Sequence, residues 1–206
     1  YFHWKNVGCN QTIYRLTEKA LPNYLYCVPV GDDDFLIPSS LSKCASFLAD
    51  NPDYRTAQGR AAYLRLDRAG AFGRIQYAGQ QWGSREYTQE KSIERFLSLF
   101  KNYSAYDFCT HRTNEYLEDS DYYFKIEDII LGEIFRSYMF AIRGKSKFID
   151  CLYSVFHFHT QHHVSQNPVK WIFQEDFRKD FYKIINALGK AIYETGELPE
   201  VEAKEF

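Results

Sequence analysis

Apolar residues recur at helical spacing in five stretches of the chain. In the first stretch, Ile13, Leu16 and Ala20 fall on one face of a helix predicted over residues 10–21. The Pro22-Asn23 pair that follows is a typical helix end. The same spacing predicts four further helices, which cover residues 38–50, 88–100, 126–142 and 168–195.

Strand-like patterns alternate with these helices. Residues 24–30, YLYCVPV, form a continuous apolar run, which is typical of a strand buried on both faces. Residues 54–67 and 72–77 predict two extended segments, joined by a hairpin at residues 69–71. The remaining candidates are residues 105–110, a short strand, residues 116–123, a loop or a broken helix, and residues 147–158, which fit either a strand or a helix.

The alternation of helices and strands predicts a single α/β domain. Neither an internal repeat nor a low-complexity linker divides the 206 residues, so we expect one domain over residues 1–206. Helices that alternate with strands favour a mostly parallel sheet flanked by helices. A small hairpin and a long C-terminal helix complete the expected architecture.

The composition is that of a folding chain without affinity for nucleic acid. Hydrophobic residues make up 45% and aromatic residues 18%, the opposite of a disordered composition. A net charge of -2 gives no broad electrostatic footprint for nucleic acid. No apolar run approaches the roughly 20 residues of a transmembrane helix. Five cysteines without a CxxC pair suit reduced thiols, so we expect a cytoplasmic protein.

Three consecutive aspartates, Asp32, Asp33 and Asp34, follow the apolar run after one glycine. Ligands bind at the carboxyl ends of strands in open α/β sheets, and carboxylate oxygens suit hard divalent cations. Because alternate residues of an extended segment share a side, Asp32 and Asp34 are expected to face one cleft at the end of a central strand. A solvated acidic turn is the competing interpretation. Apolar residues on both sides of the triplet favour a site.

An acidic pair opens the helix predicted over residues 126–142. Glu127 and Asp128 could include a general base, which must lie near an incoming hydroxyl. Glu133 is a weaker candidate for the same role. Acidic residues in a first turn also stabilise the helix terminus without any catalytic function, and this alternative stays open.

Histidines and an arginine form two further candidate clusters. His157 and His159 would face the same way in a strand, a spacing compatible with metal ligation. His162 and His163 follow closely, and incidental histidines in an aromatic strand are the alternative. Arg112, after the short strand at residues 105–110, could donate two hydrogen bonds to a phosphate or a carboxylate, or could form an ordinary surface salt bridge.

The order of these blocks resembles the bacterial GT-A glycosyltransferases of the family-2 type. The resemblance covers residues from about Tyr14 to Phe156, and its most specific part is YLYCVPVGDDDFLIPSSLSKCASFLADNPDYRTAQG. The segments SIERFLSLFKNY, YDFCTHRT, EDIILGEIF and RGKSKFID continue it. The resemblance implies a Rossmann-like (GT-A) sheet and the transfer of a sugar from a nucleotide-sugar donor to an acceptor hydroxyl. It also implies a manganese or magnesium ion (Mn²⁺ or Mg²⁺).

The resemblance further implies roles for individual residues. The triplet matches the DxD motif of the family, which puts Asp34 on the metal and Asp32 near the ribose or sugar, with Asp33 in support. The acidic pair matches the position of the catalytic base, which implies Asp128, with Glu127 second. The family's first half, a βαβ unit that holds the base of the nucleotide, has no counterpart here. We therefore expect the chain to be the C-terminal portion of a longer enzyme.

Two other functions fit the same residues. A non-catalytic carbohydrate- or nucleotide-binding module could use the abundant tyrosines to stack on sugar rings. A metal-dependent phosphoesterase could use Asp32, Asp34, His157 and His159 together. A thermal-shift panel of nucleotide-sugars with and without Mn²⁺ would reduce the uncertainty most, because a hit identifies both the nucleotide and the dependence on metal.

Overall fold

The computed structural model of the chain describes residues 7–68, 73–80, 85–106, 108–123, 125–158 and 171–198. The helices in these ranges are α1 (Cys9–Ala20), α2 (Pro38–Asp50), α3 (Ser92–Lys101), α4 (Thr113–Tyr123), α5 (Ile129–Arg143) and α7 (Glu175–Glu194). The strands are β1 (Tyr26–Cys27), β2 (Phe35–Leu36), β3 (Tyr54–Leu66), β4 (Ile75–Gln80), β5 (Thr110–Arg112) and β6 (Lys145–Phe158). No helix in these ranges combines the length and the apolar character that crossing a membrane requires.

The sheet is built around two long strands, β3 and β6, which run parallel to each other. The strand order is β1-β5-β3-β6-β2, and β4 pairs with β3 off this path. Every other pairing among these strands is antiparallel. The prediction of a mostly parallel sheet is therefore wrong, and the sheet is mixed. The alternation of elements along a sequence does not fix strand direction, because a short edge strand can pair either way.

The apolar run at residues 24–30 is not a central strand. Only Tyr26–Cys27 pairs, with β5, at the end of the strand order. Leu25 is 80% exposed and Tyr24 is 65% exposed. The prediction of a strand buried on both faces is therefore wrong, and the aspartates do not follow a central strand. A continuous apolar run is a signal of hydrophobicity, and it carries no information about where a strand lies in its sheet.

Most of the predicted helices are confirmed within a few residues. The helices α1, α2 and α5 begin and end close to the predicted bounds, while α3 begins at Ser92 and α7 at Glu175. The hairpin is confirmed by the β3–β4 pairing, and its predicted turn at residues 69–71 lies outside the described residues. The segment at residues 116–123, predicted as a loop or a broken helix, belongs to the helix α4. The segment at residues 147–158, which fitted either a strand or a helix, belongs to the strand β6. The short strand predicted at residues 105–110 lies later, as β5.

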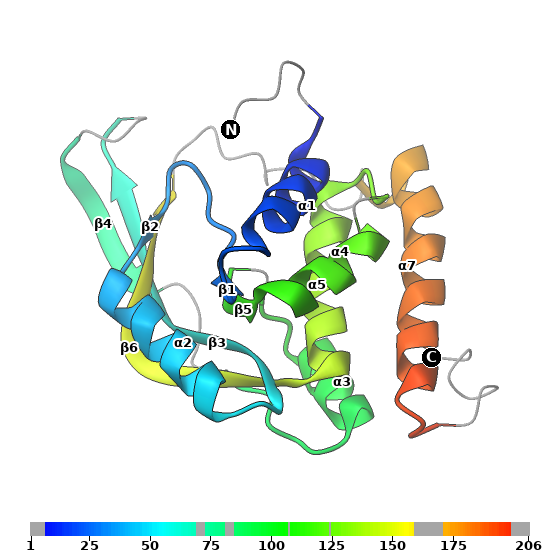
Figure 1. The fold of residues 1–206 in the computed structure, drawn as a ribbon. Coiled ribbons are helices and arrows are strands. Elements are labelled where there is room, and N and C mark those ends of the chain that lie inside the picture. The colour runs from blue at the N-terminus through cyan, green and yellow to red at the C-terminus, as the bar shows by residue number, and fades with distance from the viewer. Residues whose placement is uncertain are drawn as a thin grey trace.

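Helices lie on both sides of the curled sheet. Figure 1 shows α2 on one side and α1, α4, α5 and α7 together on the other. Cys44 and Leu48 of α2 are fully buried against β3 and β6. The apolar face of α5 packs against α7, and this core contains Leu131, Phe135, Met139, Ile142, Ile184, Leu188 and Ile192.

A buried carboxylate connects the helices to the sheet. The side chain of Asp119, in α4, is completely buried, and its Oδ2 lies 3.1 Å from a guanidinium nitrogen of Arg55 in β3. Its Oδ1 accepts a hydrogen bond from Arg143 at the end of α5, and Arg143 also lies 3.8 Å from Glu194 of α7. Burial raises the pKa of Asp119, and the two guanidinium groups oppose that rise. Asp119 therefore ties α4, β3 and α5 to one another.

Removing this carboxylate should destabilise the fold. Asp119→Ala leaves the largely buried Arg55 and Arg143 without their shared partner, and we expect it to lower the free energy of unfolding by about 3–5 kcal/mol. Urea denaturation followed by circular dichroism measures this change. Glu118→Ala is the matched control, because Glu118 is the exposed neighbour in the same helix. It should change stability by about 0.5 kcal/mol or less. Equal losses in the two variants would contradict the role of Asp119.

Candidate functional site

A cleft of about 690 Å³ lies between α1, the segment at residues 27–32 and α5. This volume is within the usual range of ligand-binding pockets. The walls are largely apolar, and the charged side chains among the lining residues are Asp32, Glu133 and Arg136. The first member of the aspartate triplet thus shares a cleft with an acidic residue of α5.

The aspartates occupy a turn instead of an extended strand. The N–H of Asp34 donates to the carbonyl of Gly31 at 3.4 Å, which closes the turn. Carboxylate oxygens of Asp34 and Asp33 lie 2.8 and 3.0 Å from the place that a Cβ on Gly31 would take. The structure therefore groups Asp33 with Asp34 over Gly31, while Asp32 is exposed and lines the cleft. The alternation that paired Asp32 with Asp34 does not apply, because it holds only for extended backbone.

Asp34 also lies beside a histidine of β6. Its Oδ1 accepts a hydrogen bond from the backbone N–H of His157 at 3.1 Å. Because β2 follows the turn and pairs with β6, with Phe35 opposite Val155, the turn is held next to the end of β6. The structure thus places the backbone of His157 beside Asp34, which accounts for two of the predicted metal ligands in sequence position only. The third, His159, lies outside the described residues.

The carboxylates of the turn fit a metal that is shared with a substrate. Within the described ranges, no three His, Cys, Asp or Glu side chains gather closely enough to hold a metal ion by themselves. Mg²⁺ is commonly bound by one or two carboxylates together with substrate phosphates and water, and does not need a cage of protein ligands. Asp33 and Asp34, which converge on Gly31, suit this smaller contribution.

Asp128, the predicted base, is the N-cap residue of α5. Its Oδ1 accepts a hydrogen bond from the N–H of Leu131 at 2.9 Å. Its Oδ2 accepts a hydrogen bond from the indole N–H of Trp171 at 2.6 Å. Both oxygens therefore hold protein groups in place, which favours the helix-terminus interpretation. A catalytic role for Asp128 stays a prediction.

The other two acidic residues of this region lie in different surroundings. Glu127 is exposed, and its carboxylate lies 3.7 Å from the ammonium of Lys179. Glu133 is half-buried, lines the cleft together with Asp32, and accepts a hydrogen bond from the hydroxyl of Tyr103 at 3.3 Å. Of the three acidic residues, Glu133 is the one that lines the same cleft as Asp32.

Arg112, the predicted phosphate contact, is bound to the end of α2. Its Nε donates to the carbonyl of Tyr54 at 3.2 Å, and its Nη2 donates to the carbonyls of Leu48 and Asn51. Glu115 lies 3.9 Å from the same guanidinium. These bonds occupy several donors of the fork, so the structure favours a structural role, and the phosphate contact stays a prediction.

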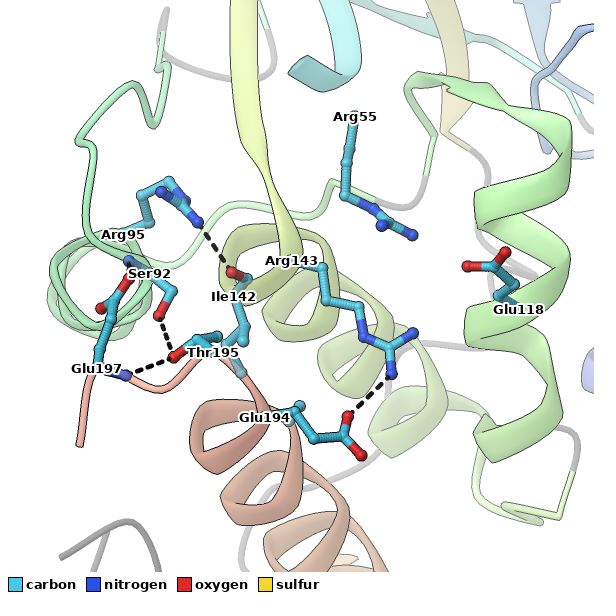
Figure 2. A pocket seen from close by; sticks show the side chains of 10 residues that line it. Arg55, Ser92, Arg95, Glu118, Ile142, Arg143, Glu194, Thr195 and Glu197 are labelled. Atoms are coloured by element: carbon cyan, nitrogen blue, oxygen red, sulfur yellow. Dashed lines mark hydrogen bonds and ion pairs between the residues drawn. The ribbon is translucent and has the colours of Figure 1, made fainter. Parts of the chain in front are cut away.

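A second, more open cavity of about 480 Å³ lies among α3, α5 and α7 (Figure 2). Its arginine side chains already bind other parts of the protein. Arg143 pairs with Asp119 and Glu194, and Arg95 donates to four main-chain carbonyls, among them that of Ile142 at 2.8 Å. The arginines of this cavity therefore serve the fold, and we do not regard it as a substrate site.

Glu197 closes one end of this second cavity and caps α3. Its carboxylate accepts hydrogen bonds from the backbone N–H groups of Ser92 and Ile93 at 2.7 and 3.1 Å. Partial burial opposes the ionisation of Glu197, but these hydrogen bonds outweigh that effect and lower its pKa. A residue that follows α7 thus replaces the side-chain cap that the N-cap residue, Lys91, does not supply.

Sequence reasoning did not identify the cleft residues of α5 as a group. Ile129, Glu133 and Arg136 follow one another at intervals of four and three residues, which places them on one face of a helix. This spacing was visible in the sequence. The other wall, α1, could not be found in the same way, because its contact with α5 joins segments that are far apart in the chain.

Comparison with known proteins adds no family to this picture. No protein-family model matches the chain, and no curated protein matches it. The resemblance to GT-A glycosyltransferases therefore stays a prediction.

The cap at Asp128 can be tested against a matched neighbour. Asp128→Ala removes the acceptor for two donors and should lower the free energy of unfolding by about 0.5–2 kcal/mol. Glu127→Ala, at the exposed preceding position, should change it by about 0.5 kcal/mol or less. Urea denaturation of both variants provides the comparison. If Asp128→Ala were as stable as the unaltered chain, the cap would contribute nothing, and the carboxylate would be available for catalysis.

Proposed function

We propose that this chain carries the reaction site of a metal-dependent glycosyltransferase, which moves a sugar from a nucleotide-sugar donor to an acceptor hydroxyl. One observation supports this proposal most strongly. Asp32, at the acidic turn, and Glu133, on α5, line the same cleft of ligand-binding size. The reaction needs two acidic functions at one place, one for the donor and one for the acceptor, and this cleft can supply both.

The acidic turn is assigned to the donor. Asp33 and Asp34 would hold the metal, and Asp32 would accept a hydrogen bond from a ribose or sugar hydroxyl. When bound, Mn²⁺ or Mg²⁺ would neutralise the charge on the departing diphosphate. Without a metal, three adjacent carboxylates would repel a diphosphate, so donor binding should require the ion.

The role of general base is assigned to Glu133. A base must come within hydrogen-bond reach of the acceptor hydroxyl, directly or through one water. Glu133 lines the cleft, and its Oε1 already accepts a hydrogen bond from the hydroxyl of Tyr103. We prefer it to Asp128, whose two oxygens bind Leu131 and Trp171.

A phosphoesterase is the second candidate, and the contact between Asp34 and His157 favours it. The hydrogen bond from the backbone of His157 to Asp34 brings the end of β6 next to the acidic turn. Asp34 would then hold a metal together with the substrate phosphate and water, next to the end of β6. In this case the chain would hydrolyse a phosphate ester and would not transfer a sugar.

Variants of the turn and of α5 should separate binding from turnover. A panel of nucleotide-sugars with and without Mn²⁺, read by thermal unfolding, should give a stabilisation that depends on the ion, because a ligand of the native state raises its stability by mass action. Asp34→Asn should weaken this stabilisation. Glu133→Gln should preserve it and lower transfer by about 10²–10⁴-fold, because the base acts in the transition state.

Glu127→Gln is the matched control for Glu133→Gln, since Glu127 is exposed and lies beside Lys179. It should leave both donor binding and transfer unchanged. Absence of any Mn²⁺-dependent response to the panel would reject the glycosyltransferase. Hydrolysis of p-nitrophenyl phosphate that Asp34→Asn abolishes would favour the phosphoesterase. Donor binding by the unaltered chain without transfer or hydrolysis would indicate a binding module.

A further inference from the structure

The walls of the cleft at the acidic turn are largely apolar. The segment at residues 27–32 contributes Val28 and Val30, and α1 contributes Ile13 and Leu16. Phe108 lines the same cleft. A free sugar acceptor would bury several hydroxyl groups against such walls, and buried hydroxyls that lack partners are costly. The walls therefore favour a ligand with a hydrocarbon body.

Three large apolar side chains that line this cleft are also exposed to solvent. Leu16 is 46% exposed, Val30 is 47% exposed and Ile129 is 57% exposed, although they come from three separate segments and line one cleft. Single exposed apolar residues are ordinary on a protein surface, but several that line one cleft favour a binding site. A ligand that extends out of the cleft would cover these three side chains.

The charged groups of the cleft define where the polar part of such a ligand lies. Glu133 and Arg136 are three residues apart on α5 and belong to one wall. Arg136 is 2% exposed and donates a hydrogen bond to the side chain of Asn10 at 3.0 Å, and this contact fixes the position of its guanidinium group. Asn10 is held in turn by its own hydrogen bond to the carbonyl of Ile126 at 2.7 Å. The cleft thus combines one rigid polar wall with an apolar remainder.

We propose that the acceptor of the transfer is an amphiphilic alcohol, whose hydroxyl lies at Glu133 and whose hydrocarbon chain lies along α1 and the segment at residues 27–32. This assignment rests on the proposed function, because it takes Glu133 to be the base. The ligand class is set by the walls: a hydroxyl-bearing polar end and an alkyl or prenyl body, with no requirement for charge.

The test compares two neutral glucosides in the absence of donor and metal. Octyl β-D-glucoside, below its micelle-forming concentration, should bind at least about tenfold more tightly than methyl β-D-glucoside, because only the longer chain covers apolar wall. Isothermal titration calorimetry measures both affinities. Leu16→Glu, at an exposed position of α1, should remove most of this preference, and Val30→Glu, in the opposite segment, should do the same independently.

Leu21→Glu is the matched control. Leu21 ends α1, is 39% exposed and is not among the residues that line the cleft, so its variant should keep the preference for the octyl chain. Equal affinity for the two glucosides would overturn the proposal, and so would an equal loss in the Leu16 and Leu21 variants.

Failure of the proposed function gives a different result. In that case the Mn²⁺-dependent response to nucleotide-sugars is absent. The preference for the octyl chain does not depend on this response, because the glucosides are titrated without donor and metal. Octyl binding without any donor response would overturn the assignment of this cleft to an acceptor, although the apolar site itself would stand.

Discussion

Asp119 holds the helical half of the molecule against the sheet. A carboxylate that is completely buried must be paired, and its partners come from β3 and from the end of α5. Because Arg143 also reaches toward Glu194, the same ion network extends to α7. The helix α5 carries the residues of the cleft wall, so the orientation of this wall relative to the sheet depends on a charge that lies outside the cleft.

The cleft itself depends on how closely α1 approaches α5. Gly132 permits this approach, since a Cβ at that position would lie 2.9 Å from the side-chain nitrogen of Asn10. Asn10 then binds both Arg136 and the carbonyl of Ile126. One polar side chain thus fixes α1 over the start of α5 and leaves the apolar cleft open beside it. The acidic turn lines this cleft because β2 pairs with β6 and holds the turn in place.

Local patterns in the sequence predicted the helices and the two strands of the hairpin, but they did not predict the direction and order of the strands in the sheet. The spacing of Leu131, Phe135, Met139 and Ile142 in α5 reflects one packed face, and such a signal is local. The position of residues 24–30 at the end of the sheet depends on pairing with β5, far along the chain, and no local pattern carries it. Asp128 illustrates the same limit for the site. An acid at a helix start fits a cap or a base, and the hydrogen bonds from Leu131 and Trp171 in the structure favour the structural role.

The assignment of the acidic turn and the α5 wall to one reaction site can be tested most directly by paramagnetic broadening in ¹⁵N-resolved NMR spectra. With a nucleoside diphosphate present, Mn²⁺ should selectively broaden the backbone amide signals of Gly31, Asp34 and His157, and more weakly that of Glu133. Without the nucleotide, the broadening should be much weaker, since the turn supplies only part of the coordination. Broadening that is independent of the nucleotide, or that centres on the cavity around Arg143 and Glu194, would contradict the assignment.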